Sequence, residues 1–190
     1  TSFRGWAHRL AAYAQAPDLT AELSFWTTML DGPSARLVDG PLVPDRDVAG
    51  SARELRLTLP PAVTEVLLTR VPAAFHASIS DVLLTGLALA IADWCRRHGR
   101  KHTAVLLDLE GHGREELSDV DLSRTVGWFT SLYPVRLDPG AIDLDEAFRG
   151  GEAIGRALKT VKEQLRAVPD RGLGYGLLRY LNPQTGETLA

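Results

Sequence analysis

The residues of this sequence that are best suited to chemistry lie in one short stretch, LLDLEGHGREE, at positions 106–116. An apolar run ends there in Glu110, and His112 and Arg114 follow, each preceded by a glycine. Carboxylate and imidazole groups are the side chains most often used in acid–base catalysis. Solvent-facing turns combine glycine with Asn, Asp or Ser instead. The stretch therefore indicates a functional site, and a solvated polar turn is the alternative interpretation.

The segments on either side predict two strands that hold this stretch in place. Residues 103–109, TAVLLDL, form a short apolar run that is typical of a buried strand. Alternation at Tyr133, Val135 and Leu137 predicts a second strand. Because Glu110 directly follows the first strand, a rigid element would deliver its carboxylate into the cleft that the loops form.

Other periodic segments predict the remaining elements. A long apolar helix is expected over 82–95, after a capping box formed by Ser78 and Asp81. Residues 55–59, LRLTL, place a leucine at every second position, as in a half-buried strand. Helical spacing is also present over 3–14, 19–30, 61–69 and 148–165. Strands that alternate with long helices indicate an α/β fold.

Glycine and proline divide the chain. Residues 31–50 contain several of both and break every periodicity, so they are expected to form a connector. We therefore divide the chain into an opening helical segment with its connector, 1–50, and an α/β lobe, 51–190. The glycines at 172, 174 and 176 do not match a dinucleotide fingerprint and predict a tight turn with close backbone approach.

Composition excludes several classes of function. The chain has 190 residues and a formal net charge of −3, so it lacks the basic excess that nucleic-acid binding requires. No apolar run is long enough to span a membrane, and no signal peptide is recognisable, so we expect a soluble, cytoplasmic protein. Cys95 is the only cysteine and is expected to be a buried small hydrophobe. The histidines lack metal-site spacing, so no metal is expected.

Three motifs carry a family resemblance. EGHGRE at 110–115, RTVGWFTSLYPV at 124–135 and GLGYGLLRYL at 172–181 resemble the signature motifs of epimerization domains of nonribosomal peptide synthetases. The resemblance covers nearly the whole chain, and EGHGRE separates these domains from the related condensation domains. It implies two chloramphenicol-acetyltransferase-like lobes, each a sandwich of a mixed sheet and packed helices, with the active site in a tunnel between them. Residues 1–190 resemble the C-terminal lobe alone, because the HHxxxD motif of the N-terminal lobe has no match.

The implied reaction inverts the α-carbon, from L to D, of an aminoacyl or peptidyl thioester in the biosynthesis of peptide antibiotics. The implied partners are the N-terminal lobe and a peptidyl carrier protein, whose phosphopantetheine arm holds the substrate. The chain itself is expected to bind no cofactor. Inversion requires a base on one face of the carbon and a proton donor on the other.

Glu110 matches the catalytic glutamate of the family. Partial burial at the strand end would raise its pKa from about 4.3 to about 6 or 7, which corresponds to roughly 3 kcal/mol of desolvation. The opposing group would be the histidine of the N-terminal lobe. His112 is expected to shape the loop or face the substrate.

The resemblance also implies substrate-binding roles for Gly111, Gly113, Tyr133 and Trp128, in addition to His112. Core packing is the favoured interpretation for Trp128, whereas Tyr133 could belong to the core or place its hydroxyl near the substrate. Arg114 is expected to form an ion pair with Glu115 or Glu116.

Two other functions stay open. A condensation-type acyltransferase lobe would share the fold and the carrier protein but would join two chains. A non-catalytic lobe would bind the carrier protein without turnover. In each case, we expect an apolar surface near Glu110 where the missing lobe would pack, and this surface could also cause self-association.

Overall fold

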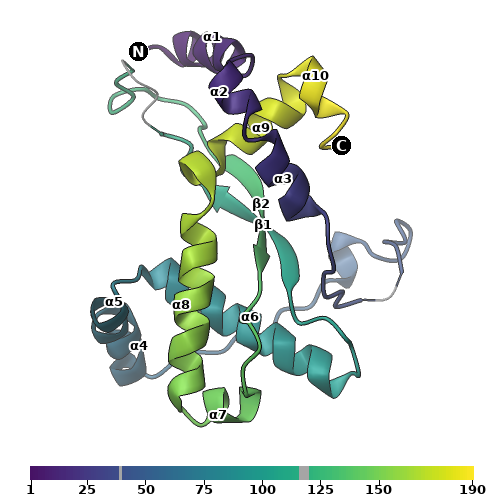
Figure 1. Cartoon of the computed structure of the whole chain (residues 1–190), viewed down its shortest axis with the longest axis vertical. Helices are drawn as coiled ribbons and strands as arrows, with labels where there is room; N and C mark the ends of the chain where they lie inside the picture. Colours follow the sequence, from purple (N-terminus) through teal and green to yellow (C-terminus); the bar gives the residue numbers. More distant parts are fainter. Residues whose placement is uncertain (39, 116–119) are drawn as a thin grey trace.

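The computed structural model describes residues 1–38, 40–115 and 120–190 (Figure 1). Figure 1 shows a hairpin of two strands at the centre, with helices gathered at both of its ends. The strands are β1 (Val105–Gly111) and β2 (Ser131–Leu137). The helices are α1 (Phe3–Tyr13), α2 (Pro17–Thr20), α3 (Leu23–Leu30), α4 (Pro61–Leu68), α5 (Arg70–Phe75), α6 (Ile79–Arg97), α7 (Leu144–Phe148), α8 (Glu152–Arg166), α9 (Leu173–Tyr180) and α10 (Pro183–Gly186). The predicted α/β class is confirmed.

Both predicted strands around the motif stretch are confirmed, and they pair with each other. The pairing is antiparallel, with Leu109 opposite Tyr133, Glu110 opposite Leu132 and Gly111 opposite Ser131. Directly opposed residues of an antiparallel pair share one face of the sheet, and successive residues alternate between faces. Glu110 and Tyr133 therefore project from opposite faces of the hairpin.

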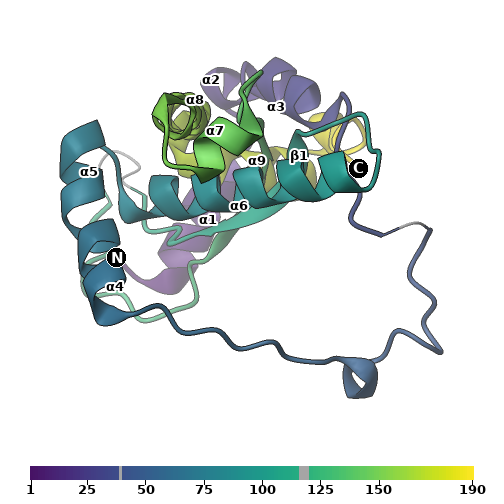
Figure 2. The same ribbon diagram turned by 90° about the horizontal axis from the view of Figure 1, so that it is seen from below.

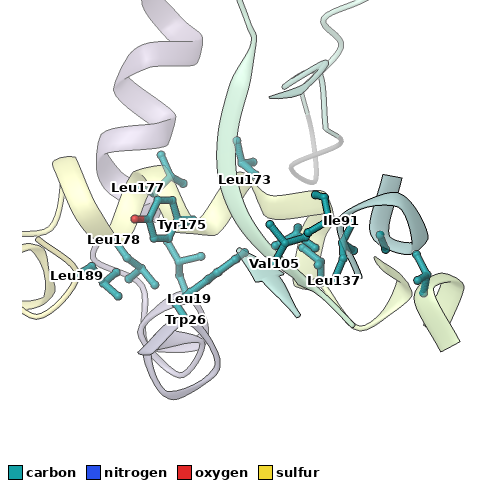
Figure 3. Packing of buried hydrophobic residues seen from close by; sticks show 14 of the residues in the cluster. Leu19, Trp26, Ile91, Val105, Leu137, Leu173, Tyr175, Leu177, Leu178 and Leu189 are labelled. Carbon is teal, nitrogen blue, oxygen red and sulfur yellow. The ribbon is translucent and has the colours of Figure 1, made fainter. Parts of the chain in front are cut away.

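The main core packs helices against this hairpin (Figure 3). Figure 3 shows Val105 and Leu137 from the strands, Ile91 from α6, and Trp26 and Tyr175 from the helices at the other end. Complete burial of a large apolar side chain stabilises the fold by about 1.5–3 kcal/mol. The cluster therefore holds the hairpin in place. Cys95 is fully buried in the same cluster, as predicted.

The central helix α6 begins where the sequence predicts. The Asp81 N–H donates to Ser78 Oγ at 3.1 Å, and the Ser78 N–H donates to Asp81 Oδ2 at 2.6 Å, so the capping box is confirmed. Burial is less complete than the apolar sequence suggests, because Leu83 and Leu87 are exposed. The described part of the chain has no element over that face.

The predicted strand over 55–59 is wrong. Residues 52–60 are extended but have no strand partner among the described residues, and Leu55 and Leu57 are more than 80% exposed. Figure 2 shows this segment standing away from the rest of the molecule, between the 3₁₀ turn Ala49–Ser51 and α4. Alternation predicts an extended backbone, but a strand also requires a neighbour to accept its backbone hydrogen bonds.

Two expected helices are interrupted. The predicted helix over 19–30 is divided between α2 and α3, and the one over 148–165 is divided between α7 and α8. Gly150, with φ of 78°, separates α7 from α8. Among the described residues no single helix has the length and apolar character of a membrane span. The helical segments Pro61–Phe75 and Ile79–Arg97 are long and apolar enough only when they are taken together, and the chain bends by 100° between them.

The glycine-rich motif at the start of α9 makes the predicted close approaches. A Cβ on Gly172 would lie 2.0 Å from the ring of Tyr133, and the φ of Gly172 is 84°. A Cβ on Gly174 would lie 2.2 Å from Glu22 Oε2. Gly176 differs, because nothing lies within 4 Å of the place where its Cβ would be.

We expect Gly176→Ala to raise the free energy of unfolding of residues 1–190 by about 0.5–1 kcal/mol, because alanine is the better helix former and no clash opposes it. Gly172→Ala is expected to lower this free energy, since its Cβ would overlap the Tyr133 ring. Urea unfolding followed by circular dichroism measures both changes. Equal effects of the two substitutions would contradict the packing described here.

Candidate functional site

The end of the hairpin opens into a groove of about 830 Å³. Its walls come from the end of β1, the beginning of α6, the end of α8 and the turn before α9. Titratable and charged side chains that line it are Asp81, Glu110, His112, Glu115, Tyr133, Arg166 and Arg171. The tertiary structure thus brings residues of the first sequence motif together with Tyr133 of the second and with Arg171, which directly precedes the third.

Glu110 lies at this groove, but its side chain is exposed. The expected partial burial is therefore not found in residues 1–190. Glu110 shares its face of the hairpin with Leu132, which is also exposed. In the described part of the chain, no helix or loop covers this end of that face. His112 is exposed as well and lines the same groove.

Tyr133 belongs to both the core and the groove. Its ring packs against the main core cluster and beneath Gly172, while the residue also lines the groove. Burial raises the pKa of its hydroxyl, the negative charge of Glu115 raises it further, and the positive charge of Arg171 opposes them. The hydroxyl therefore stays protonated at neutral pH and can donate a hydrogen bond.

The two glycines of EGHGRE are required by the protein's own atoms. Gly113 has φ of 62°, and a Cβ there would lie 1.5 Å from the Phe129 carbonyl oxygen. A Cβ on Gly111 would lie 2.6 Å from Ser131 Oγ. The motif loop thus lies directly on the segment that leads into β2. Both glycines thus contact residues of this chain, and their expected role in substrate binding stays a prediction.

Arg114 bonds to backbone carbonyl groups and not to Glu115, one of its two expected partners. Its guanidinium donates to the carbonyl oxygens of Leu122 at 2.7 Å and Thr125 at 2.9 Å, and it lies 4.0 Å from the centre of the Phe129 ring. Glu115, one expected partner, instead lies 3.5 Å from Arg171. The other, Glu116, lies outside the described residues. Arg114 joins the motif loop to the segment before β2.

The structure contradicts the expected position of Trp128. The favoured core position is wrong, because Trp128 is 85% exposed, whereas Phe129 is buried against Trp6 and Leu122. Successive residues of an extended segment point to opposite sides, so only one of two adjacent aromatic residues can enter the core. Trp128 also lines a different groove from Glu110.

Arg171 is a groove residue that the sequence does not single out. Asp170 and Arg171 have φ of 41° and 50°, and Gly172 continues this left-handed turn. Non-glycine residues in this region cost about 1–3 kcal/mol each, so their surroundings must hold them there. The turn places Arg171 beside Glu115. A glycine-rich loop was recognisable in the sequence, but its unusual backbone at two preceding residues was not.

Metal-binding geometry is absent from the described residues, which contain no group of three His, Cys, Asp or Glu side chains that could hold an ion. The groove can supply a carboxylate, an imidazole and a protonated phenol. Such a set can remove a proton from a bound molecule or return one to it.

Comparison with known proteins gives a consistent family. A model of the condensation domain matches residues 1–189. The chain is 44% identical over 189 residues to a linear gramicidin synthase of Brevibacillus parabrevis, and 35% identical over 181 residues to tyrocidine synthase 2 of the same organism. These matches cover 98% and 95% of this chain, but only 2% and 5% of the relatives.

Two solved structures share the fold. The epimerization domain from the third module of tyrocidine synthetase B matches with a TM-score of 0.77 and 35% identity, over 99% of this chain and 39% of that one. The SgcC5 protein from Streptomyces globisporus matches with a TM-score of 0.58 and 19% identity, over 98% of this chain and 38% of that one.

Proposed function

The chain belongs to the condensation-domain family, and we propose that it forms the C-terminal lobe of an epimerization domain of a nonribosomal peptide synthetase. The intact domain would invert the α-carbon of an aminoacyl or peptidyl group held as a thioester on a carrier protein. The observation that carries this proposal is the position of Glu110: a rigid hairpin presents its carboxylate at the open end of a groove. The likeness to the solved epimerization domain over 99% of this chain supports it.

Proton transfer at the α-carbon is the chemistry proposed for Glu110. The carboxylate would take the α-proton, and the electrons of the broken C–H bond would move into the thioester carbonyl to form an enolate-like anion. A second group on the opposite face would then return a proton to carbon. We assign this second group to the histidine of the N-terminal lobe, because the groove in residues 1–190 leaves one side of Glu110 open. Tyr133 lines the same groove but projects from the face of the hairpin opposite to Glu110, so its role in substrate binding stays a prediction separate from this proton transfer.

Glu110 is exposed in residues 1–190, so another surface would have to cover it to desolvate the proposed base. Desolvation destabilises a carboxylate and raises its pKa. Docking of the N-terminal lobe over this end of the hairpin would provide that desolvation. The phosphopantetheine arm would reach Glu110 through the space between the lobes.

A condensation-type acyltransferase is the second candidate, because the matching family model describes the condensation domain. The EGHGRE sequence and the likeness to an epimerization domain favour inversion.

The discriminating experiment supplies an L-aminoacyl carrier protein to the two-lobed domain and, in parallel, to residues 1–190 alone. We expect the two-lobed domain to produce the D-aminoacyl thioester and residues 1–190 alone to produce none. The released amino acid is analysed by chiral chromatography, with and without an acceptor aminoacyl carrier. A new dipeptide without inversion would establish the condensation reaction. Inversion by residues 1–190 alone would refute the need for a second lobe.

A further inference from the structure

A second groove, of about 340 Å³, lies on the face of the hairpin that carries Glu110. Leu132, the cross-strand neighbour of Glu110 on that face, lines this groove, and so does Gly113 of the EGHGRE motif. The Cβ atoms of directly opposed residues in an antiparallel pair lie about 4.5–5.5 Å apart. The groove therefore begins within reach of the carboxylate that is the proposed base.

Apolar and aromatic side chains form the walls of this groove. Phe3, Trp128, Leu132 and Tyr180 line it and are exposed, whereas Phe129, which also lines it, is buried. Among the described residues that line it, none is Asp, Glu, Lys, Arg or His. Such a surface binds apolar groups and disfavours charged ones, because burial of an unpaired charge is costly.

The fold of residues 1–190 already forms this groove. Phe129 packs edge-on against Phe3, with 5.3 Å between ring centres, and the Arg114 guanidinium lies 4.0 Å from the centre of the Phe129 ring. On α9, Gly176 leaves the groove open, because nothing lies within 4 Å of the place where its Cβ would be. Preformed apolar pockets of about 300–1,000 Å³ are typical of small-molecule sites. The groove is thus large enough to take one amino-acid side chain.

We propose that this apolar groove binds the side chain of the substrate residue whose α-carbon lies at Glu110, and that it makes the domain select apolar and aromatic residues. This proposal rests on the epimerization proposed above. The α-carbon bears both the proton that Glu110 would remove and the substrate side chain, so a side chain bound beside Leu132 keeps the α-proton near the carboxylate. The groove of about 830 Å³ has charged walls and is left for the polar thioester and the phosphopantetheine arm.

A series of substrates tests the selectivity in the two-lobed domain. L-Phe, L-Leu, L-Ala and L-Asp are supplied on the same carrier protein, and incorporation of solvent deuterium at the α-carbon gives kcat/KM for each. We expect the values for L-Phe and L-Leu to exceed that for L-Asp by about 10-fold or more, since differences of one or a few methylene groups in an apolar pocket already discriminate this strongly. Equal values for all four substrates would overturn the proposal.

A substitution on α9 tests the groove itself. Gly176→Leu extends a side chain into the open space, and we expect it to lower the ratio of kcat/KM for L-Phe to that for L-Ala by about 10-fold or more. L-Ala is expected to keep nearly its wild-type value, because a methyl group needs little of the groove. Gly86→Leu on α6 is the matched control, since nothing lies within 4 Å of its Cβ position and Gly86 lines neither groove. It is expected to leave the ratio unchanged.

Two results with Gly176→Leu would overturn the proposal. An unchanged ratio would show that the substrate side chain binds elsewhere. An equal loss for L-Phe and L-Ala would show that a protein surface, and not the substrate side chain, occupies the groove.

A binding measurement separates this proposal from the proposed epimerization. Trp128 lines the groove and is 85% exposed, so the difference in fluorescence between the wild type and Trp128→Phe reports on the groove without turnover. We expect this signal to change when the pantetheine amide of L-Phe is added, and not with that of L-Asp. A two-lobed domain that gave this response but exchanged no α-proton would refute the epimerization and support the groove. Exchange without the response would overturn the groove alone.

Discussion

Glu110→Gln in the two-lobed domain is expected to slow α-proton exchange by about 10²–10⁴-fold, the usual contribution of general acid–base catalysis. Glutamine keeps the volume and a carbonyl oxygen but cannot accept the proton, and the exposed position means that the fold does not depend on the carboxylate. Incorporation of solvent deuterium at the α-carbon of the carrier-bound residue measures proton removal before the ratio of L to D forms changes.

Two controls make this result specific to Glu110. His112→Ala is expected to reduce exchange far less, because His112 lies beyond the end of β1, whereas Glu110 lies within the paired strand. Glu115→Gln removes a carboxylate from the same groove, one that already faces Arg171, and is also expected to have a small effect. If Glu110→Gln exchanged the α-proton at nearly the wild-type rate and His112→Ala showed no exchange, the base would be assigned to the histidine.

Gly113→Ala is expected to lower the free energy of unfolding of residues 1–190 by about 3 kcal/mol or more, from the sum of a left-handed backbone and an overpacked contact. The added Cβ would lie 1.5 Å from the Phe129 carbonyl oxygen. The next nearest atoms belong to the backbone of Phe129 and Ser131, which cannot rotate away as a side chain can. Urea unfolding gives the change in free energy, and loss of soluble protein would be the extreme form of the same effect.

Gly99→Ala is the matched control. Its φ of 63° is nearly the same as that of Gly113, but nothing lies within 4 Å of its Cβ position. It is expected to cost about 1–2 kcal/mol from the backbone conformation alone. If the two substitutions destabilised the protein equally, the contact between the motif loop and Phe129 would not exist in solution.

Much of the fold near the site could be predicted from local sequence. Residues 103–109 and 133–137 form the strands that their patterns predict, and the α6 capping box forms as expected. A tight turn with close backbone approach was also predicted for the glycine-rich segment at the start of α9, and Gly172 and Gly174 make such approaches. These features depend on neighbours in sequence, on backbone conformation and on side-chain periodicity, so the sequence alone determined them.

Partners distant in sequence decided the rest. Alternation shows that adjacent side chains point to opposite sides, but it does not show which side another element covers. This is why Phe129 and not Trp128 is buried, why residues 55–59 remain unpaired, and why Glu110 is exposed in residues 1–190. Arg114 likewise bonds to carbonyl groups 8 and 11 residues away, whereas the adjacent Glu115 lies beside Arg171. Burial and hydrogen-bond partners depend on which surfaces are in contact in three dimensions, and only the tertiary structure decides those contacts.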